Sequence, residues 1–206
     1  MELQKAQQIT SKLFDIFAPI CKRIEWVGGV KREKKDVHDI EFLMILKEGR
    51  PLPEFGKPKN LYETHLDKLL ADMEYDGILR QASDKKDGGR YKKRALIGTG
   101  ELNEFCVDLF IVNEKTWGIQ NVIRTGPALF SHRFVENRSK KIYSRELGRE
   151  FWGFLPNDLE YIRGETEIRR GGVALNLPWE SDVINLLGVG WIEWNKRADF
   201  ALRESI

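Results

Sequence analysis

Residues 39–46 read DIEFLMIL, and the rest of the fold is inferred outward from them. They include no glycine or proline and are rich in branched and aromatic side chains, so we expect a β-strand. Alternate residues of a strand face the same side. Asp39 and Glu41 should therefore share one face, while Ile40 and Phe42 turn toward the core. Two acids on one strand face indicate either an ordinary solvated surface or part of a functional site.

A second strand is predicted at residues 105–112, FCVDLFIV, where Asp108 stands among apolar residues. A buried charge without a partner would be costly there, so this aspartate is either a satisfied core acid or a ligand. If the two strands are neighbours, Asp39, Glu41 and Asp108 surround shared metal ions that offset their mutual repulsion. Carboxylates are the ligands that Mg²⁺ prefers, and such ions assist phosphoryl transfer by drawing charge off the phosphates.

A pair of glycines precedes the first strand. Gly28 and Gly29 stand in the sequence WVGGV, and Gly28 lies eleven residues before Asp39. Paired glycines predict a turn in which the backbone can approach another group closely. Backbone amides of such a turn can bind phosphate. A glycine turn followed by paired carboxylates therefore predicts a site for a phosphate group and a metal ion.

The spacing of apolar residues predicts the other elements of a mixed α+β fold. This spacing predicts helices at residues 5–24, 61–73 and 180–187, and the basic segment 130–149, which follows a turn signal at residues 125–127, is also expected to be helical. Two strands that should pair as a hairpin, and one loop, are expected at residues 78–81, 91–97 and 49–60. After Trp117 the sequence changes to a basic segment and then to short apolar pieces that alternate with glycine and proline. We therefore place one domain at residues 1–118 and a small α/β domain at residues 119–206.

The composition is that of an ordinary globular protein, with 41% hydrophobic and 32% charged residues. The apolar runs are far shorter than the ~18 residues of a membrane span. Cys21 and Cys106 are the two cysteines, which excludes a disulfide framework and a cysteine-rich zinc site. The N-terminus has no signal-peptide pattern, so we expect a cytoplasmic protein.

The net charge is only +2, but lysine and arginine are unevenly distributed. They cluster at residues 31–35, 85–94 and 124–149. A clustered basic surface attracts a phosphate backbone even when the whole molecule is nearly neutral. Runs of lysine are equally often solvated loops with no partner, so each cluster is open to both interpretations.

Several segments, in order, resemble the family X DNA polymerases, the DNA polymerase β kind. GGVKREKKDVHDIEFL (28–43) is similar to the family's glycine turn, arginine and acidic pair, and FCVDLFIV to the strand with its third aspartate. RTGP (124–127) is similar to the Thr-Gly turn where palm and thumb meet. WESDVINLLGVGWIEWNKR (179–197) is similar to the end of the thumb, so the resemblance covers nearly the whole chain.

The resemblance implies a nucleotidyltransferase palm and a thumb, without the lyase and fingers domains. Such a protein adds nucleotides from (d)NTPs to the 3′ end of DNA with two Mg²⁺ or Mn²⁺ ions, here as a monomeric, low-fidelity, repair-type DNA polymerase. Asp39, Glu41 and Asp108 would be the catalytic metal ligands, with Asp108 best placed to help deprotonate the 3′-hydroxyl. Contacts to the nucleotide are implied for Gly28, Gly29, Arg32, His38, Arg124, Thr125 and Gly126.

Basic residues of both domains are expected to bind the DNA backbone, and the affinity should fall steeply as the salt concentration rises. These residues are Arg124, Arg133, Arg138, Lys140, Lys141 and the segment 85–94. Gly29, His38 and Glu41 depart from the family, which usually has serine, glycine and aspartate there. A template-independent enzyme that acts on RNA, a small molecule or a protein hydroxyl is the alternative. A catalytically silent nucleic-acid-binding module would be indicated if the three carboxylates did not converge.

Overall fold

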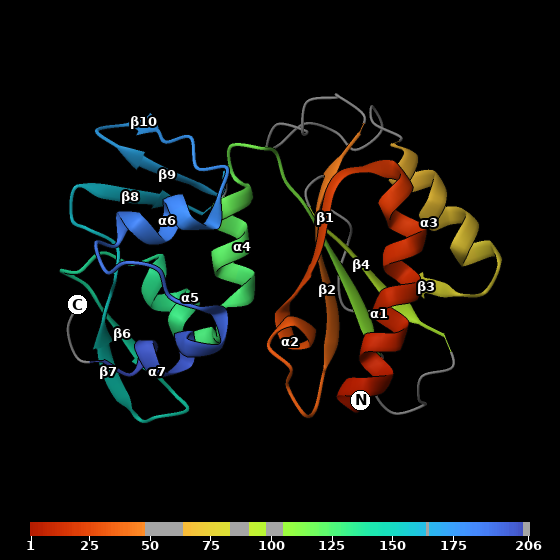
Figure 1. Cartoon of the computed structure of the whole chain (residues 1–206), viewed down its shortest axis with the longest axis horizontal. Helices are drawn as coiled ribbons and strands as arrows, with labels where there is room; N and C mark the ends of the chain where they lie inside the picture. Colours follow the sequence, from red (N-terminus) through yellow and green to blue (C-terminus); the bar gives the residue numbers. More distant parts are fainter. Residues whose placement is uncertain (48–63, 83–90, 98–104, 164, 204–206) are drawn as a thin grey trace. The chain divides into compact units, whose positions relative to one another are not determined.

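The computed structural model describes residues 1–47, 64–82, 91–97, 105–163 and 165–203 (Figure 1). It confirms the mixed α+β class, with helices and a mixed five-stranded sheet accompanied by smaller sheets. The chain divides into two compact units, Met1–Asn113 and Glu114–Ile206. The division thus comes slightly before residue 118, where the sequence had suggested it. Helix α4 (Trp117–Thr125) lies wholly in the second unit, and the Gly118 amide donates to the Leu177 carbonyl there over 3.1 Å.

The first unit is built on a sheet with the strand order β1-β2-β5-β4-β3. Its strands are β1 (Cys21–Val27), β2 (Asp39–Leu46), β3 (Leu79–Gln81), β4 (Tyr91–Leu96) and β5 (Cys106–Ile111). Strands β2 and β5 are parallel, and the other neighbours are antiparallel. Its helices are α1 (Leu3–Phe17), the 3₁₀ turn η1 (Ala18–Ile20), α2 (Gly28–Lys31) and α3 (His65–Tyr75). The predicted strands and the predicted hairpin pairing are therefore confirmed; the loop predicted at residues 49–60 lies outside the described residues.

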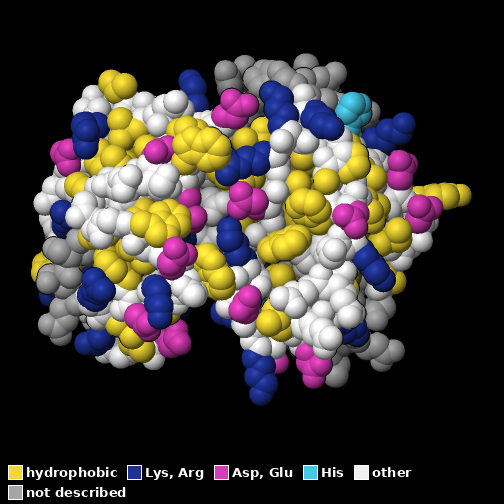
Figure 2. Space-filling model, viewed as in Figure 1, with side chains coloured by type: hydrophobic (Ala, Val, Ile, Leu, Met, Phe, Trp, Pro, Cys, Tyr) yellow, Lys and Arg dark blue, Asp and Glu magenta, His cyan; other side chains and the backbone are white. Residues whose placement is uncertain are grey.

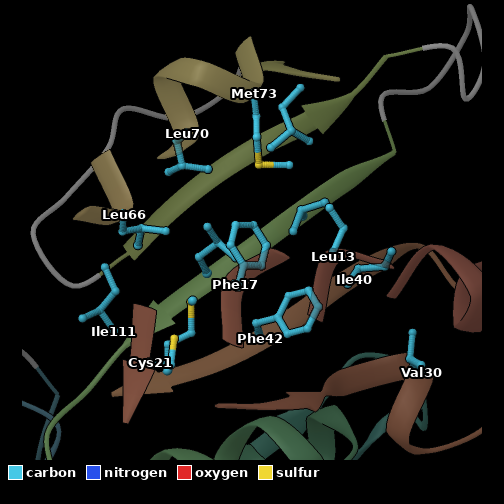
Figure 3. Close-up of a cluster of buried hydrophobic side chains, with 14 of the residues drawn as sticks. Leu13, Phe17, Cys21, Val30, Ile40, Phe42, Leu66, Leu70, Met73 and Ile111 are labelled. Carbon is cyan, nitrogen blue, oxygen red and sulfur yellow. The ribbon is translucent and has the colours of Figure 1, made fainter. Parts of the chain in front are cut away.

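Helices α1 and α3 cover one face of this sheet (Figure 1), and the core lies between them and the strands. Ile40 and Phe42 are fully buried there, as the alternation predicted. Phe42 meets Phe17 of α1 edge to face, with ring centroids 5.6 Å apart. Figure 3 shows the side chains of both helices directed at the strands. One face of the sheet is thereby committed to the core, and the acids of β2 lie on the other.

The helix predicted for residues 5–24 is wrong at its C-terminal end, residues 18–24. Helix α1 ends at Phe17, and residues 21–27 form β1, antiparallel to β2. Pro19 stands in the connecting 3₁₀ turn, where its ring and missing amide stop the helix. Ile24, which fits the helical spacing, instead lies on the strand opposite Met44. Strand pairing with β2 supplies hydrogen bonds that the local periodicity does not reveal.

The second unit combines short helices with two small sheets. Its helices are α4 (Trp117–Thr125), α5 (Ala128–Phe134), α6 (Glu180–Leu186), the 3₁₀ turn η3 (Trp194–Lys196) and α7 (Arg197–Ala201). Its strands are β6 (Lys141–Ser144), β7 (Arg149–Trp152), β8 (Leu159–Ile162), β9 (Glu167–Arg170) and β10 (Val173–Ala174). Helix α6 confirms the predicted helix near residue 180, with Val183 fully buried.

The helix predicted for residues 130–149 is wrong beyond Phe134. Helix α5 ends at Phe134, and residues 141–152 form the β6–β7 hairpin. Gly148 turns this hairpin with φ +63°, a conformation that glycine adopts without strain. Tyr143 and Phe151 suit strands, and the basic residues around them gave no helical apolar stripe.

Among the described residues, none of the helices is both long and apolar enough to pass through a bilayer.

Candidate functional site

The three predicted acids lie on one face of the sheet in the first unit. Glu41 of β2 is directly opposite Asp108 of the parallel strand β5, and Asp39 is opposite Cys106. Residues paired across strands share a face, and so do residues two apart along a strand. All three acids are therefore directed away from the apolar core, and each is partly buried. The topology brings together residues that are far apart in the sequence.

Gly28 is in intimate contact with Glu41. It follows β1 directly, at the start of α2, and has φ +65°. A Cβ atom built on Gly28 would lie 2.3 Å from Glu41 Oε1, far inside van der Waals contact. At Gly29 the nearest atom, Val37 Cγ1, would be at an ordinary 3.6 Å. The positive φ and the closeness of the Glu41 carboxylate therefore favour glycine at the first position of the pair, whereas neither applies to the second.

Arg32 brings a positive charge to the two acids of β2. It caps the C-terminal end of α2, where its backbone amide donates to the Gly28 carbonyl over 3.1 Å. Burial lowers the pKa of its guanidinium, and the charges of Glu41 and Asp39 act in the opposite direction. These interactions mean that Arg32 lies near both carboxylates. The predicted cluster of a glycine turn, an arginine and an acidic pair is therefore assembled within one unit.

Asp108 has a partner that the sequence did not reveal. The hydroxyl of Tyr91, on β4, donates a hydrogen bond to Asp108 Oδ1 over 2.9 Å. The Tyr91 ring also packs beside Phe110, with centroids 5.2 Å apart. Lys93 lies directly opposite Asp108 in the register of β4 and β5. The predicted hairpin strand was the signal, but the pairing of β4 with β5 had to be known to use it.

A fourth acid on the same face, Glu25 of β1, pairs with two basic residues. Lys31 donates to Glu25 Oε2 over 3.2 Å, and Arg23 donates to Oε1 over 3.3 Å. Because β1 pairs with β2, Glu25 lies opposite Leu43, two residues beyond Glu41. Lys31, at the end of α2, is thereby held beside Glu25. His38, next to Asp39 in the chain, has an exposed side chain.

The three acids have the donor chemistry that Mg²⁺ and Mn²⁺ prefer, carboxylate oxygens on one sheet face. In the part of the chain that the structure describes, however, no three His, Cys, Asp or Glu side chains are close enough together to hold a metal ion. Glu41 lies against Gly28, and Asp108 accepts its bond from Tyr91. The backbone register therefore suits a shared metal site, and the side chains have other partners in this structure.

The predicted nucleotide contacts Arg124, Thr125 and Gly126 belong to the second unit. Thr125 is fully buried, and its hydroxyl donates to the Asn121 carbonyl (2.6 Å) and to Glu180 Oε1 (3.0 Å). Arg197, also fully buried, bonds to the same hydroxyl and forms an ion pair with Glu180 at 2.8 Å. At Gly126 a Cβ would lie 2.7 Å from the Phe130 ring, so the tight turn requires glycine. Thr125 and Gly126 therefore have evident roles in the packing of their own unit.

Two arginines predicted to contact DNA are structural. Arg133 is 1% exposed and donates to the carbonyls of Trp152 (2.6 Å), Ala201 (2.6 Å) and Arg203 (2.7 Å), so its prediction as a DNA contact is wrong. Arg138 donates to the carbonyls of Phe154 and Leu187 over 3.1 and 2.5 Å. A guanidinium has several donors in one plane, which lets one arginine bind the carbonyls of several backbone segments.

The basic segment 85–94 is also not a uniform surface. Lys92 and Arg94 alternate onto the buried face of β4, where they pair with Asp67 and Glu74 of α3. Both are less than a tenth exposed, so the expected contact with DNA is wrong for these two residues. Residues 85–90 lie outside the described part of the chain.

No protein-family model matches the sequence, and no curated protein matches it. The resemblance to family X polymerases therefore stays a prediction that depends on the motifs and on the geometry described above.

Proposed function

We propose that this chain is a metal-dependent nucleotidyltransferase of the family X type, which adds nucleotides to the 3′ end of DNA. The observation that supports it most is the register that pairs Glu41 with Asp108, with Asp39 on the same face. Gly28 and Arg32 meet the acidic pair from a turn that the same motif predicts. Carboxylates beside a glycine turn and an arginine suit a substrate that carries both a metal ion and phosphates.

In the proposed reaction Asp39, Glu41 and Asp108 would hold Mg²⁺ or Mn²⁺. A bound ion supplies charge neutralisation for the triphosphate and lowers the pKa of the attacking hydroxyl. Asp108, at the centre of its strand, would accept the proton of the primer 3′-hydroxyl. The backbone amides of the α2 turn and the Arg32 guanidinium would bind the β- and γ-phosphates, since both offer hydrogen-bond donors to an anion.

The charges around the acids support an anionic substrate. Three carboxylates alone would repel a triphosphate, but Arg32 lies near two of them and Lys93 lies opposite the third. Lys31 is held beside Glu25 of the same sheet face. A face that alternates acids and bases can attract both a divalent cation and a polyphosphate. These neighbouring bases therefore favour a substrate-binding role for the acids over that of an ordinary solvated strand surface.

Primer extension tests the proposal. Purified protein should extend single-stranded, recessed or gapped DNA with dNTPs or rNTPs in the presence of Mg²⁺ or Mn²⁺. Asp108→Asn should lower the rate by at least about a hundredfold, since a ligand and proton acceptor is removed. Asp15→Asn, a change at an exposed position of α1, is the matched control and should have no effect.

An Asp108→Asn protein that extends primers at the wild-type rate would contradict the proposed site. If DNA is not extended but RNA or a small hydroxylated acceptor is, in an Asp108-dependent manner, the alternative acceptor is correct and the metal site stands. If no acceptor is modified by the wild-type protein, the chain is a silent module and the proposal fails.

A further inference from the structure

The β6–β7 hairpin of the second unit carries large aromatic side chains on an exposed face. The register pairs Lys141 with Trp152 and Tyr143 with Glu150, so these four side chains share that face. Tyr143 is 63% exposed and Trp152 is 44% exposed. Aromatic side chains stabilise a fold most when they are buried, so two exposed rings on one small sheet indicate a binding surface.

The opposite face of the hairpin is firmly attached to the unit. Phe151 is buried there, 5.3 Å from the Arg133 guanidinium. Arg133 donates to the Trp152 carbonyl, and the Gly153 amide donates to the Lys140 carbonyl over 2.9 Å. A Cβ on Gly153 would lie 2.1 Å from the Glu136 carbonyl oxygen, so this strand end is closely packed. The two exposed rings therefore belong to a hairpin that is packed firmly against the rest of its unit.

The charge around the β6–β7 hairpin is mainly positive. Residues 138–152 include five lysines or arginines and two glutamates. Lys141 Nζ lies 4.9 Å from the centre of the Trp152 ring and pairs with Glu150 at 2.9 Å. Lys140 and Arg145 are exposed beside it. Figure 2 shows basic and hydrophobic side chains together, with some acidic ones, where Figure 1 draws β6 and β7.

We propose that this face binds single-stranded nucleic acid. Bases stack on Tyr143 and Trp152, and Lys140, Lys141 and Arg145 attract the phosphates. Stacking on an aromatic side chain contributes about 1–3 kcal/mol per base and tolerates any sequence. Tyr143 and Trp152 occupy diagonal positions on neighbouring strands, roughly 7–8 Å apart, so each ring can receive a different base. A strand held here would be a substrate overhang, a role that depends on the proposed function; the binding itself does not.

The test is the fluorescence anisotropy of a short labelled oligo(dT) titrated with the full chain. Tyr143→Ala and Trp152→Ala should each weaken binding by about fivefold to a hundredfold, the range that corresponds to one lost stack. Tyr143→Phe and Trp152→Phe should retain most of the affinity, because a ring remains. Matched controls are Tyr75→Ala and Trp191→Ala, exposed aromatics outside the hairpin, which should bind like wild type.

Several results would overturn the inference. One is unchanged affinity in Tyr143→Ala and Trp152→Ala proteins that melt like the wild type. Another is equal affinity for a duplex of the same length, which would mean that only phosphates are bound. Self-association that Trp152→Ala abolishes would assign the face to a second copy of the chain. Asp108→Asn should bind oligo(dT) normally. Wild-type protein that binds oligo(dT) but extends no primer would contradict the proposed catalysis but not this surface.

Discussion

The Tyr91 hydroxyl donates a hydrogen bond to Asp108 Oδ1 over 2.9 Å, from the strand next to the one that carries the acid. This bond and the packing of the Tyr91 ring on Phe110 help to orient the Asp108 carboxylate. Asp108 lies opposite Glu41, so its orientation sets how the two acids face each other. We therefore regard Tyr91 as a positioning residue of the proposed site.

Tyr91→Phe should lower the rate of primer extension by about tenfold, since a hydrogen bond to a charged group contributes about 1.5–3 kcal/mol. The ring and its packing remain, so the melting temperature should change little. The concentration of Mn²⁺ that gives half-maximal activity should rise, because Asp108 is less well oriented. Tyr75→Phe, at a 93% exposed position, is the control. An unchanged rate and metal dependence would refute the positioning role.

Gly28→Ala and Gly29→Ala should behave very differently. An alanine at position 28 must adopt φ +65° and would collide with the Glu41 carboxylate, whereas one at position 29 meets only ordinary contacts. The left-handed conformation alone costs about 1–2 kcal/mol. Gly28→Ala should therefore lower stability by at least that amount and abolish extension, while Gly29→Ala keeps both. Urea denaturation and primer extension measure the two effects; equal behaviour would mean that the contact is unimportant.

Arg133→Met should destabilise the protein rather than weaken its contact with DNA. The change removes the donor for the carbonyls of Trp152, Ala201 and Arg203, and acceptors left without donors cost about 1–3 kcal/mol each where water cannot reach them. Removing a buried charge returns part of this, so we expect a net loss of about 2–3 kcal/mol. The urea midpoint reports it, with exposed Arg163→Met as control. Full stability with weaker oligonucleotide binding would restore the original prediction.

Cys21 should make the protein less stable as the pH rises above 9. Burial raises the pKa of its thiol to about 12 from the ordinary 9.0, an effect that Lys47 partly opposes. Between these values the unfolded thiol loses its proton while the folded one keeps it, so the folded state binds more protons and stability falls with pH. The limiting slope from this group is about 1.4 kcal/mol per pH unit. Denaturation between pH 8 and 10 should show a smaller decline in Cys21→Ala, and parallel curves would exclude this cause.

Local patterns were sufficient for the strands that carry the acids. Strand β2 begins at Asp39 and ends at Leu46, as predicted, because its branched and aromatic residues follow one another without glycine or proline. The alternation of side chains along the strand correctly directed Ile40 and Phe42 to the core. Helix α6 was likewise evident from its apolar spacing. In these elements the residues whose pattern predicts the structure are the same consecutive residues that form the helix or strand.

Contacts between distant segments could not be obtained in this way. Strand β1 looked like a continuation of α1 until its pairing with β2 was known, and the β6–β7 hairpin carries basic residues that fit either structure. Whether Arg133 is a surface charge or a buried donor depends on carbonyls up to 70 residues away. Strand patterns and the resemblance to the family X motifs indicated the three acids of the proposed site. Their common face, the glycine against Glu41 and the tyrosine bound to Asp108 arise from strand order and register, because those alone bring such residues within bonding distance.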